Sequence, residues 1–259
     1  MAPVKNLREA YGQALVALGK RNRHVVALEA DLGKSTRSIL FQGAFPDRYF
    51  EMGIAEQNMA STAAGLALAG KIPFMHSFAV FASGRAFDQL RNSVCIPGLS
   101  VRICGSSCGL SDFGDGKTHQ ALEDVAIMRV LPGMTVLCPA DAIEVTKMVP
   151  CLLDWKGPVY LRINRNDLPF VTPDSEPYGI TLQGSDVVWF TERAGNRVGR
   201  YQVSTDRLIE YALPTPGSQP TDIAVDGAGC AWYTASAADR LGRLCPSAMG
   251  ATYLPLVLR

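Results

Sequence analysis

An acidic residue begins the most apolar of the helices that the sequence predicts. Gly53 ends an extended segment, and Glu56 follows within a run from Ala55 to Ala69 that carries no other charged residue. A carboxylate in this position can cap the helix, because the dipole of a helix N-terminus favours negative charge. It can also meet a ligand in a pocket that excludes water. The position alone favours the cap.

Two aromatic residues and a histidine follow downstream. Phe78 and Phe81 are three residues apart, about one helical turn, so both rings can face the same cavity. Packing in the core is the more common role of such a pair. His119 is one of three histidines and lies four residues after Asp115 in a glycine-rich loop. Since Asp-Gly also favours a tight turn, the residues alone leave both interpretations open.

Arg8, Arg165 and Ser35 are candidates for binding a phosphate. The planar guanidinium of arginine makes paired hydrogen bonds to phosphate oxygens. The alternative is structural, with Arg8 as a solvated helix residue and Arg165 in a salt bridge at the end of a strand. The sequence is compatible with either interpretation.

The elements that must position these residues alternate between strand and helix. Short connections between them predict a parallel sheet covered on both faces, a doubly wound α/β fold. Ligands of such folds bind at the carboxyl ends of the strands, so the loops at 30–35, 76–81 and 105–119 should gather on one edge. Strands are expected at 24–29, near 49, and at 72–75, 99–104, 134–138 and 159–163, and helices at 6–18, 55–69, 79–94, 121–130 and 140–153.

Composition indicates a globular protein with few special requirements. Of 259 residues, 47% are hydrophobic and 19% charged, and the net charge of +1 without a basic cluster argues against nucleic acid as the main partner. The sequence shows neither the apolar run of a signal peptide nor a stretch of about 18 apolar residues that would span a membrane. Its seven cysteines are expected to be reduced thiols, which predicts a cytoplasmic protein without a metal site of its own.

The chain changes character after about residue 171. Residues 172–176 form a linker-like run with two prolines, and residues 177–259 consist of predicted strands and turns. This tail repeats at an offset of 43 residues, a period typical of propeller blades. Two repeats are fewer than the roughly 4–8 blades of a closed ring. We therefore expect four of its aromatic residues to be partly exposed: Trp189, Phe190, Trp232 and Tyr233.

Residues from about 7 to 168 resemble the pyrimidine-binding domain of transketolases, most closely the separate C-terminal subunit of the split bacterial form. The resemblance implies the thiamine-diphosphate-binding fold, in which the cofactor lies between two subunits. Thiamine diphosphate and Mg²⁺ would then be shared with a diphosphate-binding partner subunit that carries the metal ligands, in a dimer or heterotetramer. The motifs that carry the resemblance are DLGKS (31–35), GIAEQNM (53–59), PFMHSFAVF (73–81), DQLRNSV (88–94), FGDGKTHQALEDVAIMR (113–129) and PGMTV (132–136).

The resemblance also implies roles for individual residues. The carboxyl of Glu56 would hydrogen-bond the N1′ atom of the aminopyrimidine, and with the motif in place catalysis is favoured over capping. Two positions depart from the family pattern, since Gly84 stands where a third aromatic residue is common and Ser107 where a second histidine is common. The remaining implied roles are ring stacking for Phe78 and Phe81, cofactor contact across the dimer for Asp31, binding of sugar hydroxyls for Asp115, hydroxyl binding and proton transfer for His119, and binding of the sugar phosphate for Arg8, Ser35 and Arg165.

These features predict a subunit that transfers a two-carbon ketol unit between sugar phosphates and is inactive without its partner. The alternatives are a related thiamine enzyme such as deoxyxylulose-phosphate synthase, an inactive fusion or remnant, and a β-rich binding module. The tail is similar to blades of streptogramin-lyase-type propellers. It contains no histidine that could serve as the base of that lyase chemistry, and it stands where transketolases carry their third domain.

Overall fold

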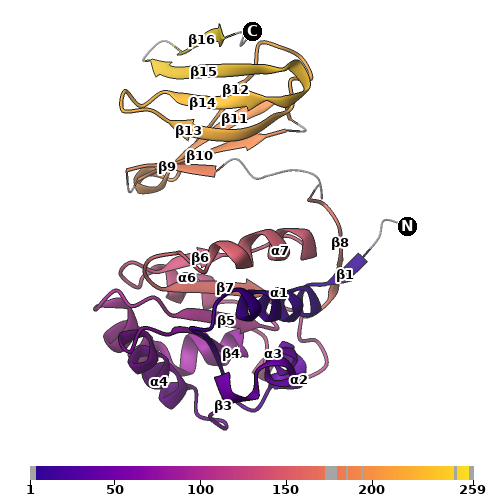
Figure 1. Ribbon diagram of the computed structural model, residues 1–259, viewed down its shortest axis with the longest axis vertical. Helices are drawn as coiled ribbons and strands as arrows, with labels where there is room; N and C mark the ends of the chain where they lie inside the picture. The colour runs from indigo at the N-terminus through magenta and orange to yellow at the C-terminus, as the bar shows by residue number, and fades with distance from the viewer. Residues whose placement is uncertain (1–3, 173–179, 185, 194, 248–249, 257–259) are drawn as a thin grey trace. The chain divides into compact units, whose positions relative to one another are not determined.

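The computed structural model describes residues 4–172, 180–184, 186–193, 195–247 and 250–256. The chain divides into two compact units, Met1–Pro173 and Asp174–Arg259 (Figure 1). Of the expected linker at 172–176, only Thr172 is described. Its amide and that of Val171 donate hydrogen bonds of 2.6 and 2.7 Å to Asp141 Oδ2, which ties this end of the described segment to the first unit.

The first unit confirms the predicted α/β fold. Its central sheet has six strands in the order β3-β2-β4-β5-β7-β6, and every pairing is parallel. A separate antiparallel pair joins β1 (Val4–Asn6) to β8 (Asp167–Pro169). The strands of the central sheet are β2 (Val25–Glu29), β3 (Tyr49–Glu51), β4 (Ile72–Phe78), β5 (Arg102–Ser106), β6 (Thr135–Leu137) and β7 (Val159–Ile163).

Helices cover both faces of this sheet (Figure 1). Side chains alternate between two apolar cores because successive residues of a strand point to opposite faces. In β2, Ala27 packs on one side with α1 and α7, whereas Leu28 packs on the other side with α4. The helices are α1 (Leu7–Arg21), α2 (Gly33–Thr36), α3 (Ile39–Ala44), α4 (Glu56–Leu68), α5 (Phe87–Gln89), α6 (Asp124–Arg129) and α7 (Ala142–Cys151), with 3₁₀ turns at Pro46–Arg48 and Gly116–Thr118.

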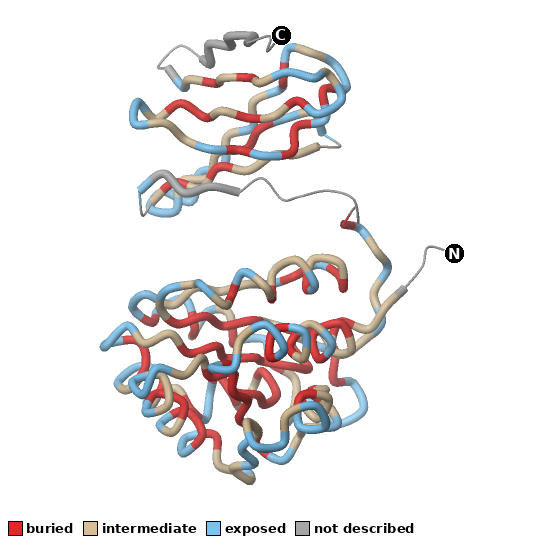
Figure 2. The backbone as a smooth tube through the Cα atoms, viewed as in Figure 1, coloured by how far each residue is buried: buried red, intermediate tan, exposed pale blue. Residues whose placement is uncertain are grey.

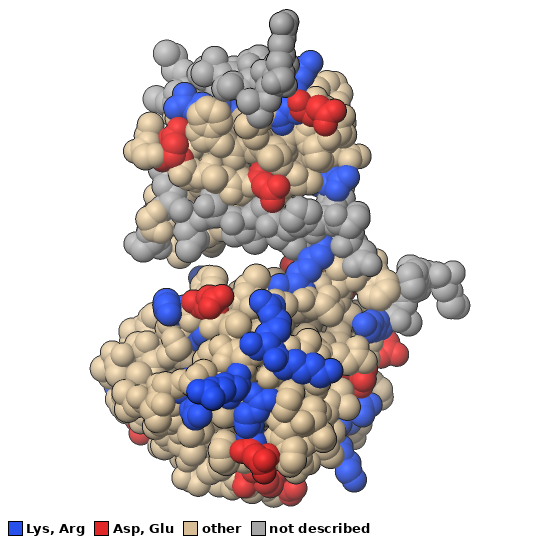
Figure 3. Space-filling view, viewed as in Figure 1, with Lys and Arg blue, Asp and Glu red and all other residues tan. Residues whose placement is uncertain are grey.

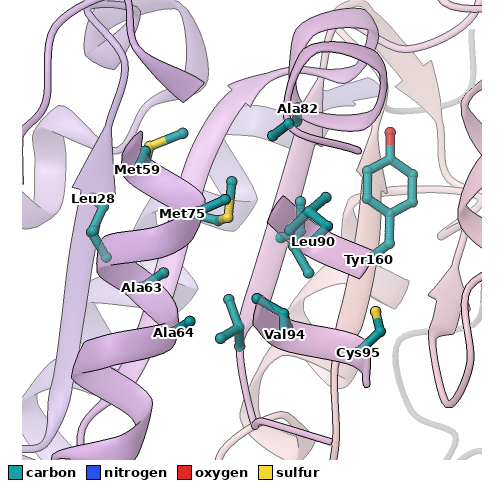
Figure 4. Packing of buried hydrophobic residues seen from close by; sticks show 14 of the residues in the cluster. Leu28, Met59, Ala63, Ala64, Met75, Ala82, Leu90, Val94, Cys95 and Tyr160 are labelled. Carbon is teal, nitrogen blue, oxygen red and sulfur yellow. The ribbon is translucent and has the colours of Figure 1, made fainter. Parts of the chain in front are cut away.

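Burial follows this layered arrangement. The strands of the sheet are buried along most of their length, while the outer faces of the helices are exposed (Figure 2). Figure 4 shows Met59, Ala63 and Ala64 of α4 near Met75 of β4, in the same apolar core as Leu90. The small residues of α4 allow it to approach the sheet closely, which places the first turn of this helix over buried surface.

Charge is less evenly spread than the composition suggests. Figure 3 shows Lys and Arg side chains gathered over α1, with acidic side chains at the border of this region. Lys20 and Arg21 lie in the last turn of α1. Cations are favoured at that end of a helix because the carbonyl groups there carry partial negative charge.

The segment expected to form one helix at 79–94 is instead interrupted. Two π-helical turns, Phe81–Arg85 and Leu90–Cys95, flank the short α5. The hydroxyl of Ser83 donates a hydrogen bond of 2.6 Å to the carbonyl of Ala79, and such a bond competes with the backbone pattern of an α-helix. A π turn widens the helix by one residue and often occurs at functional sites. The two π turns therefore change which residues of this segment lie on the same face of the helix.

The second unit consists of two four-stranded antiparallel sheets, one for each repeat. Their orders are β12-β11-β10-β9 and β13-β14-β15-β16, and Figure 1 shows one sheet behind the other. One apolar core draws residues from both sheets. The strands are β9 (Ile180–Gln183), β10 (Val187–Glu192), β11 (Arg197–Gln202), β12 (Arg207–Ala212), β13 (Pro220–Val225), β14 (Ala231–Ala235), β15 (Arg240–Ser247) and β16 (Gly250–Leu256), with 3₁₀ turns at Val203–Thr205 and Ser236–Ala238.

Two expectations for the tail are wrong. Trp189 and Tyr233 are buried, at 0% and 5% exposure, because the two sheets cover each other; Phe190 and Trp232 are partly exposed as expected. Cysteines are not all reduced, since Cys230 and Cys245 form a disulfide between β14 and β15. Antiparallel pairing brings these two cysteines opposite each other, which their spacing of 15 residues did not reveal.

Candidate functional site

The predicted site residues lie around the carboxyl edge of the parallel sheet. Phe78 ends β4, Asp31 follows β2 by two residues, and Arg165 follows β7 by two residues. The loop that contains Asp115 and His119 follows β5. The sheet therefore gathers on one edge the loops that the sequence predicted would meet there.

Glu56 is the first residue of α4 and is 1% exposed. The hydroxyl of Ser77, in β4, donates a hydrogen bond of 2.9 Å to its Oε1. The guanidinium of Arg85, in the first π turn, donates one of 2.7 Å to its Oε2. Both oxygens of this buried carboxylate thus bond side chains from other elements.

An aromatic cluster lies beside this acid. The rings of Phe78 and Phe81 are stacked, with centroids 6.1 Å apart and planes inclined by 14°. The imidazole of His119 meets both rings edge-on, at 6.0 Å from Phe78 and 5.2 Å from Phe81. Arg85 lies 4.4 Å from the centre of the Phe81 ring, and it connects this cluster to Glu56. The position where Gly84 replaces an aromatic residue is exposed, and the guanidinium of Arg85 covers the ring instead.

Arg165 links the aromatic cluster to the acidic loop. Its Nη1 lies 2.6 Å from Asp112 Oδ2 and 3.4 Å from Asp115 Oδ2, and its guanidinium carbon is 5.8 Å from the centre of the Phe78 ring. Asp112 is buried at 0% exposure, whereas Asp115 is exposed. The expected salt bridge at the strand end is therefore present, together with contact to two of the predicted site residues.

Arg8 and Arg165 line one pocket of about 380 Å³. The other residues that line it include Asn6, Ser111 and Asp167. Burial lowers the pKa of Arg8, and the positive charge of Arg165 lowers it further. Two guanidinium groups that repel each other in this way favour an anion between them.

Ser35 and Asp31 lie in a neighbouring pocket of about 420 Å³. The backbone carbonyl of Ser35 accepts a hydrogen bond of 2.8 Å from Arg8, which lines the first pocket. Asp31 has a left-handed backbone with a φ of 61°, and its amide donates a hydrogen bond of 2.8 Å to Glu51. Asp31 is thus held at the edge of the sheet by its backbone, with no contact of its own to the aromatic cluster among the interactions of the described residues.

Several buried polar atoms near this edge lack a hydrogen-bond partner within the described structure. They include the hydroxyls of Ser106 and Ser107, the Oδ1 atom of Asp112 and the Nε atom of Arg8. Buried polar atoms are almost always paired, so unpaired ones at a strand edge fit a site that a polar ligand completes. Ser107, which departs from the family pattern, supplies one of them.

Sequence reasoning missed Ser77, Arg85 and Asp112. Arg85 carries a detectable signal, because it lies four residues after Phe81, within reach of the same face in a helix. Ser77 and Asp112 have no such signal, since their roles depend on contacts between distant segments. Arg162, near the end of β7, pairs with the buried Asp124 at 2.8 Å.

The other two histidines have no direct contact to this cluster within the described structure. His24 is exposed in the turn before β2. His76 is buried, its Nδ1 lies 2.8 Å from the carbonyl of Leu28, and its Nε2 lies 2.7 Å from the hydroxyl of Tyr11. Because a carbonyl can only accept, Nδ1 carries the proton and Tyr11 donates to Nε2. Burial lowers the pKa of His76 to about 4.

The described residues contain neither a cluster of metal ligands nor a membrane-spanning helix. No group of three or more His, Cys, Asp or Glu side chains there could hold a metal ion. No helix of that part of the chain is both long and apolar enough to cross a membrane.

The fold and this edge define the first unit as a parallel α/β domain with its candidate site where the parallel strands end. Comparison with known families identifies it further, because the family described as "Transketolase, pyrimidine binding domain" matches residues 4–171. The chain belongs to this family. Residues 161–255 match a second family, described as "Virginiamycin B lyase family", which agrees with the resemblance of the tail.

Relatives support the same assignment. A protein of Methanocaldococcus jannaschii described as a transketolase C-terminal section is 44% identical over 172 residues, which are 66% of this chain and 54% of that protein. A 6-deoxy-6-sulfo-D-fructose transketolase subunit of Clostridium is 43% identical over 176 residues, 68% of this chain and 54% of that protein. Human transketolase is 39% identical over 174 residues, 67% of this chain but 28% of that protein. The chain thus spans about half the length of the first two relatives.

Solved structures support the same family assignment. A structure described as "Split gene transketolase, inactive beta4 tetramer" matches with a TM-score of 0.59 and 46% identity, over 72% of this chain and 61% of that chain. Transketolase of Campylobacter jejuni, at 22% identity and a TM-score of 0.62 over 71% of this chain and 30% of that chain, shows the shared fold.

Proposed function

We propose that the chain is a transketolase-type subunit that transfers a two-carbon ketol unit between sugar phosphates with thiamine diphosphate. The observation that supports this most is the cluster in which Arg85 joins Glu56 to the stacked rings of Phe78 and Phe81. It combines a buried carboxylate with two stacked rings at the edge where the fold binds ligands. No other cluster of the described residues joins these chemical features.

The residues present fit the aminopyrimidine end of the cofactor. Stacked phenylalanine rings offer flat apolar surface to a heteroaromatic ring. The carboxyl of Glu56 can hydrogen-bond a ring nitrogen, and Arg85, which now contacts it, has a side chain 41% exposed that can move towards solvent. Thiamine diphosphate supplies a nucleophilic carbon that accepts the two-carbon unit. Glu56 would hold and return a proton at N1′.

The acidic loop and the arginine pocket suit the sugar phosphate. His119 lies against the aromatic cluster, and its Nδ1 atom is paired with Thr118. Its second ring nitrogen, Nε2, could therefore bind a substrate hydroxyl or deliver a proton to it. Asp115 would bind a hydroxyl beside it. Arg8 and Arg165 would bind the phosphate in the pocket that they share, with Ser35 bordering it. Asp31 would face the part of the cofactor that another subunit holds.

A partner subunit completes this proposal. The described residues include no cluster of metal ligands, so Mg²⁺ and the diphosphate would be bound by a diphosphate-binding subunit in a dimer or heterotetramer. The related structure described as "Split gene transketolase, inactive beta4 tetramer" supports the expectation that this chain is inactive by itself. A cytoplasmic location remains part of this proposal. The five free thiols of the first unit favour it, whereas the Cys230–Cys245 disulfide of the tail does not.

The first prediction tests this function through Glu56. In complex with a diphosphate-binding subunit, Glu56→Gln should keep the fold but lower the rate of hydrogen–deuterium exchange at C2 of bound thiamine diphosphate by at least about 100-fold, the usual contribution of a proton-transferring group. An amide cannot supply the carboxyl proton to N1′. The measurement is C2 exchange by NMR after rapid quenching.

Glu144→Gln is the matched control. Glu144 also lies in the first turn of a helix, α7, where it bonds the amide of Ala140. Its replacement should leave exchange unchanged. Accelerated exchange that is equally fast in Glu56→Gln and in the unaltered complex would remove Glu56 from the mechanism. Exchange in the unaltered complex no faster than in free thiamine diphosphate would favour the inactive remnant.

A further inference from the structure

The 43-residue repeat relates the two sheets of the tail residue by residue. Trp189 corresponds to Trp232, and Phe190 corresponds to Tyr233. The relation extends to side-chain contacts, because Arg200 lies 5.8 Å from the ring centre of Trp189 and Arg243 lies 5.2 Å from that of Trp232. The two sheets are therefore copies of one structural unit.

The sheets pack through faces that do not correspond to each other. The first sheet contributes the face that contains Trp189 and Val198, and the second contributes the face that contains Tyr233 and Leu244. Successive residues of a strand point to opposite faces. Hence the face with Tyr233 in the second sheet corresponds to the face with Phe190 in the first, which points away from this core.

The corresponding faces are left on the outside of the pair. We call them the outer face of the first sheet, with Val188, Phe190 and Leu208, and the outer face of the second sheet, with Ala224, Trp232 and Leu241. Cross-strand pairing places each set on one side of its sheet. Leu208 is 52% exposed and Ala224 is exposed, while the other four are partly exposed.

We propose that a second copy of this chain occupies these faces, with the outer face of its first sheet packed against the outer face of the second sheet. The packing would repeat the one already present within the chain, since each outer face is the counterpart of one half of it. Such an interface joins two different surfaces, so copies associate head to tail and can close into a ring. A propeller of about 4–8 blades corresponds to two to four copies.

The polar groups of these faces are compatible with such packing. Arg243 covers Trp232 and is held by Asp226 at 3.1 Å. The same Arg–Trp arrangement, Arg200 on Trp189, exists in the sheet that is already packed, where Trp189 is 0% exposed. Charged residues on the outer face of the first sheet depart from the relation. Glu192 stands where the packed face has Ala235, and Glu210, on the same face, pairs with Arg197 at 2.8 Å.

Tryptophan fluorescence of the full chain tests the proposal. Trp155→Phe leaves two tryptophans, one of which, Trp189, is already buried. Association through the outer faces should shift the emission of Trp232 to shorter wavelength as the concentration rises. Trp232 lies on the outer face of the second sheet, so this signal reports on that face, and light scattering gives the mass in parallel.

Three single variants in this background distinguish the faces from the rest of the tail. Leu208→Glu and Ala224→Glu each place a charge on one outer face at an exposed position, so the fold is retained and the shift should be lost. Val203→Glu is the matched control, because Val203 is 48% exposed but lies in a turn outside both faces. It should keep the shift.

Mixing provides the decisive measurement. Leu208→Glu retains an intact second-sheet face and Ala224→Glu an intact first-sheet face, so an equimolar mixture should recover one interface and about half of the shift per chain. A shift that persists in both single variants, a tail that shows no shift up to high micromolar concentration, or a mixture that recovers nothing would each overturn the proposal.

Discussion

At the scale of single residues, the ion pair of Glu56 and Arg85 joins a buried acid to a half-exposed cation. The second prediction concerns this pair. Arg85→Met keeps apolar length over Phe81 but leaves Glu56 with Ser77 as its only remaining partner among the contacts described here. We expect the first unit to lose about 1–3 kcal/mol in free energy of unfolding, the usual cost when a buried polar group loses its partner.

Arg85 positions the acid and does not itself transfer the proton. The Arg85→Met complex should therefore retain C2 exchange to a much larger extent than Glu56→Gln. Arg91→Met, at an exposed arginine that bonds Asn92, controls for the loss of charge. A first unit as stable as the unaltered one would show that the ion pair contributes nothing.

Two other buried groups, Glu29 and His76, make the free energy of unfolding depend on pH in opposite directions. Burial raises the pKa of Glu29 from 4.5 to about 7, so the folded state gains a proton first and this stabilisation is lost as the pH rises through 7. Burial lowers the pKa of His76 from 6.5 to about 4, so the unfolded state gains a proton first. The contribution of His76 is complete above pH 6.5 and is lost as the pH falls towards 4.

The third prediction follows from this opposition. In the unaltered chain the two effects nearly cancel between pH 5 and pH 8. In Glu29→Gln only the His76 effect remains, so the free energy of unfolding should rise by about 2 kcal/mol from pH 5 to pH 8. Hydrogen exchange of amides in β2 and β4, corrected for the intrinsic effect of pH, measures it. Glu123→Gln, at an exposed acid, should behave as the unaltered chain, and a flat profile for Glu29→Gln would contradict the argument.

The types and spacing of the residues were enough to identify only part of this site from the sequence. Glu56, Phe78 and Phe81 were identifiable because an acid at an apolar helix start and rings one turn apart have local signatures, which the family motif then made specific. Asp112 and Ser77 could not be identified in this way. Their importance comes from Arg165 and Glu56, which are 53 and 21 residues distant in sequence.

At the scale of elements, the disulfide between β14 and β15 fixes one hairpin of the second sheet. The fourth prediction is that Cys245→Ser lowers the free energy of unfolding of the tail by about 3 kcal/mol under oxidising conditions, since the bond closes a loop of about 15 residues. Thermal unfolding followed by calorimetry, with and without reductant, measures it. The difference should vanish with reductant. Cys151→Ser, which removes an exposed free thiol, should change neither condition.

Periodicity predicted most elements of the first unit because its strands are buried and bounded by loops. The helix expected at 79–94 was wrong in kind, since π turns arise from single hydrogen-bond competitions such as that of Ser83, which hydrophobic spacing does not encode. The burial of Trp189 was also missed. Repeat counting indicated too few blades for a ring, yet two blades are enough to cover one face of each.

At the scale of the whole molecule, the two units have separate apolar cores. The clusters of the first unit contain residues from 7 to 170, and the cluster of the tail contains residues from 187 to 244. The fifth prediction is that removal of residues 177–259 leaves the first unit folded. Its free energy of unfolding should change by less than about 0.5 kcal/mol, as for changes away from packed features.

Thermal unfolding followed by far-ultraviolet circular dichroism, compared with the first transition of the full chain, checks this prediction. Removal of residues 250–259 alone, which shortens only the second sheet, is the control. Cooperative loss of helical signal on removal of the whole tail would show that the tail had become part of the core of the first unit.

The antiparallel pair of β1 and β8 makes the first unit suitable for insertion into longer polypeptides. Val4–Asn6 and Asp167–Pro169 lie side by side, so the chain enters and leaves the first unit at one point. A domain with adjacent ends can be inserted into a longer chain, or permuted, without distorting its interior. In human transketolase the matched segment makes up 28% of the polypeptide, and here it is followed by a tail that resembles a different family. Because the ends of the domain are adjacent, both gene arrangements are possible without distortion of its interior.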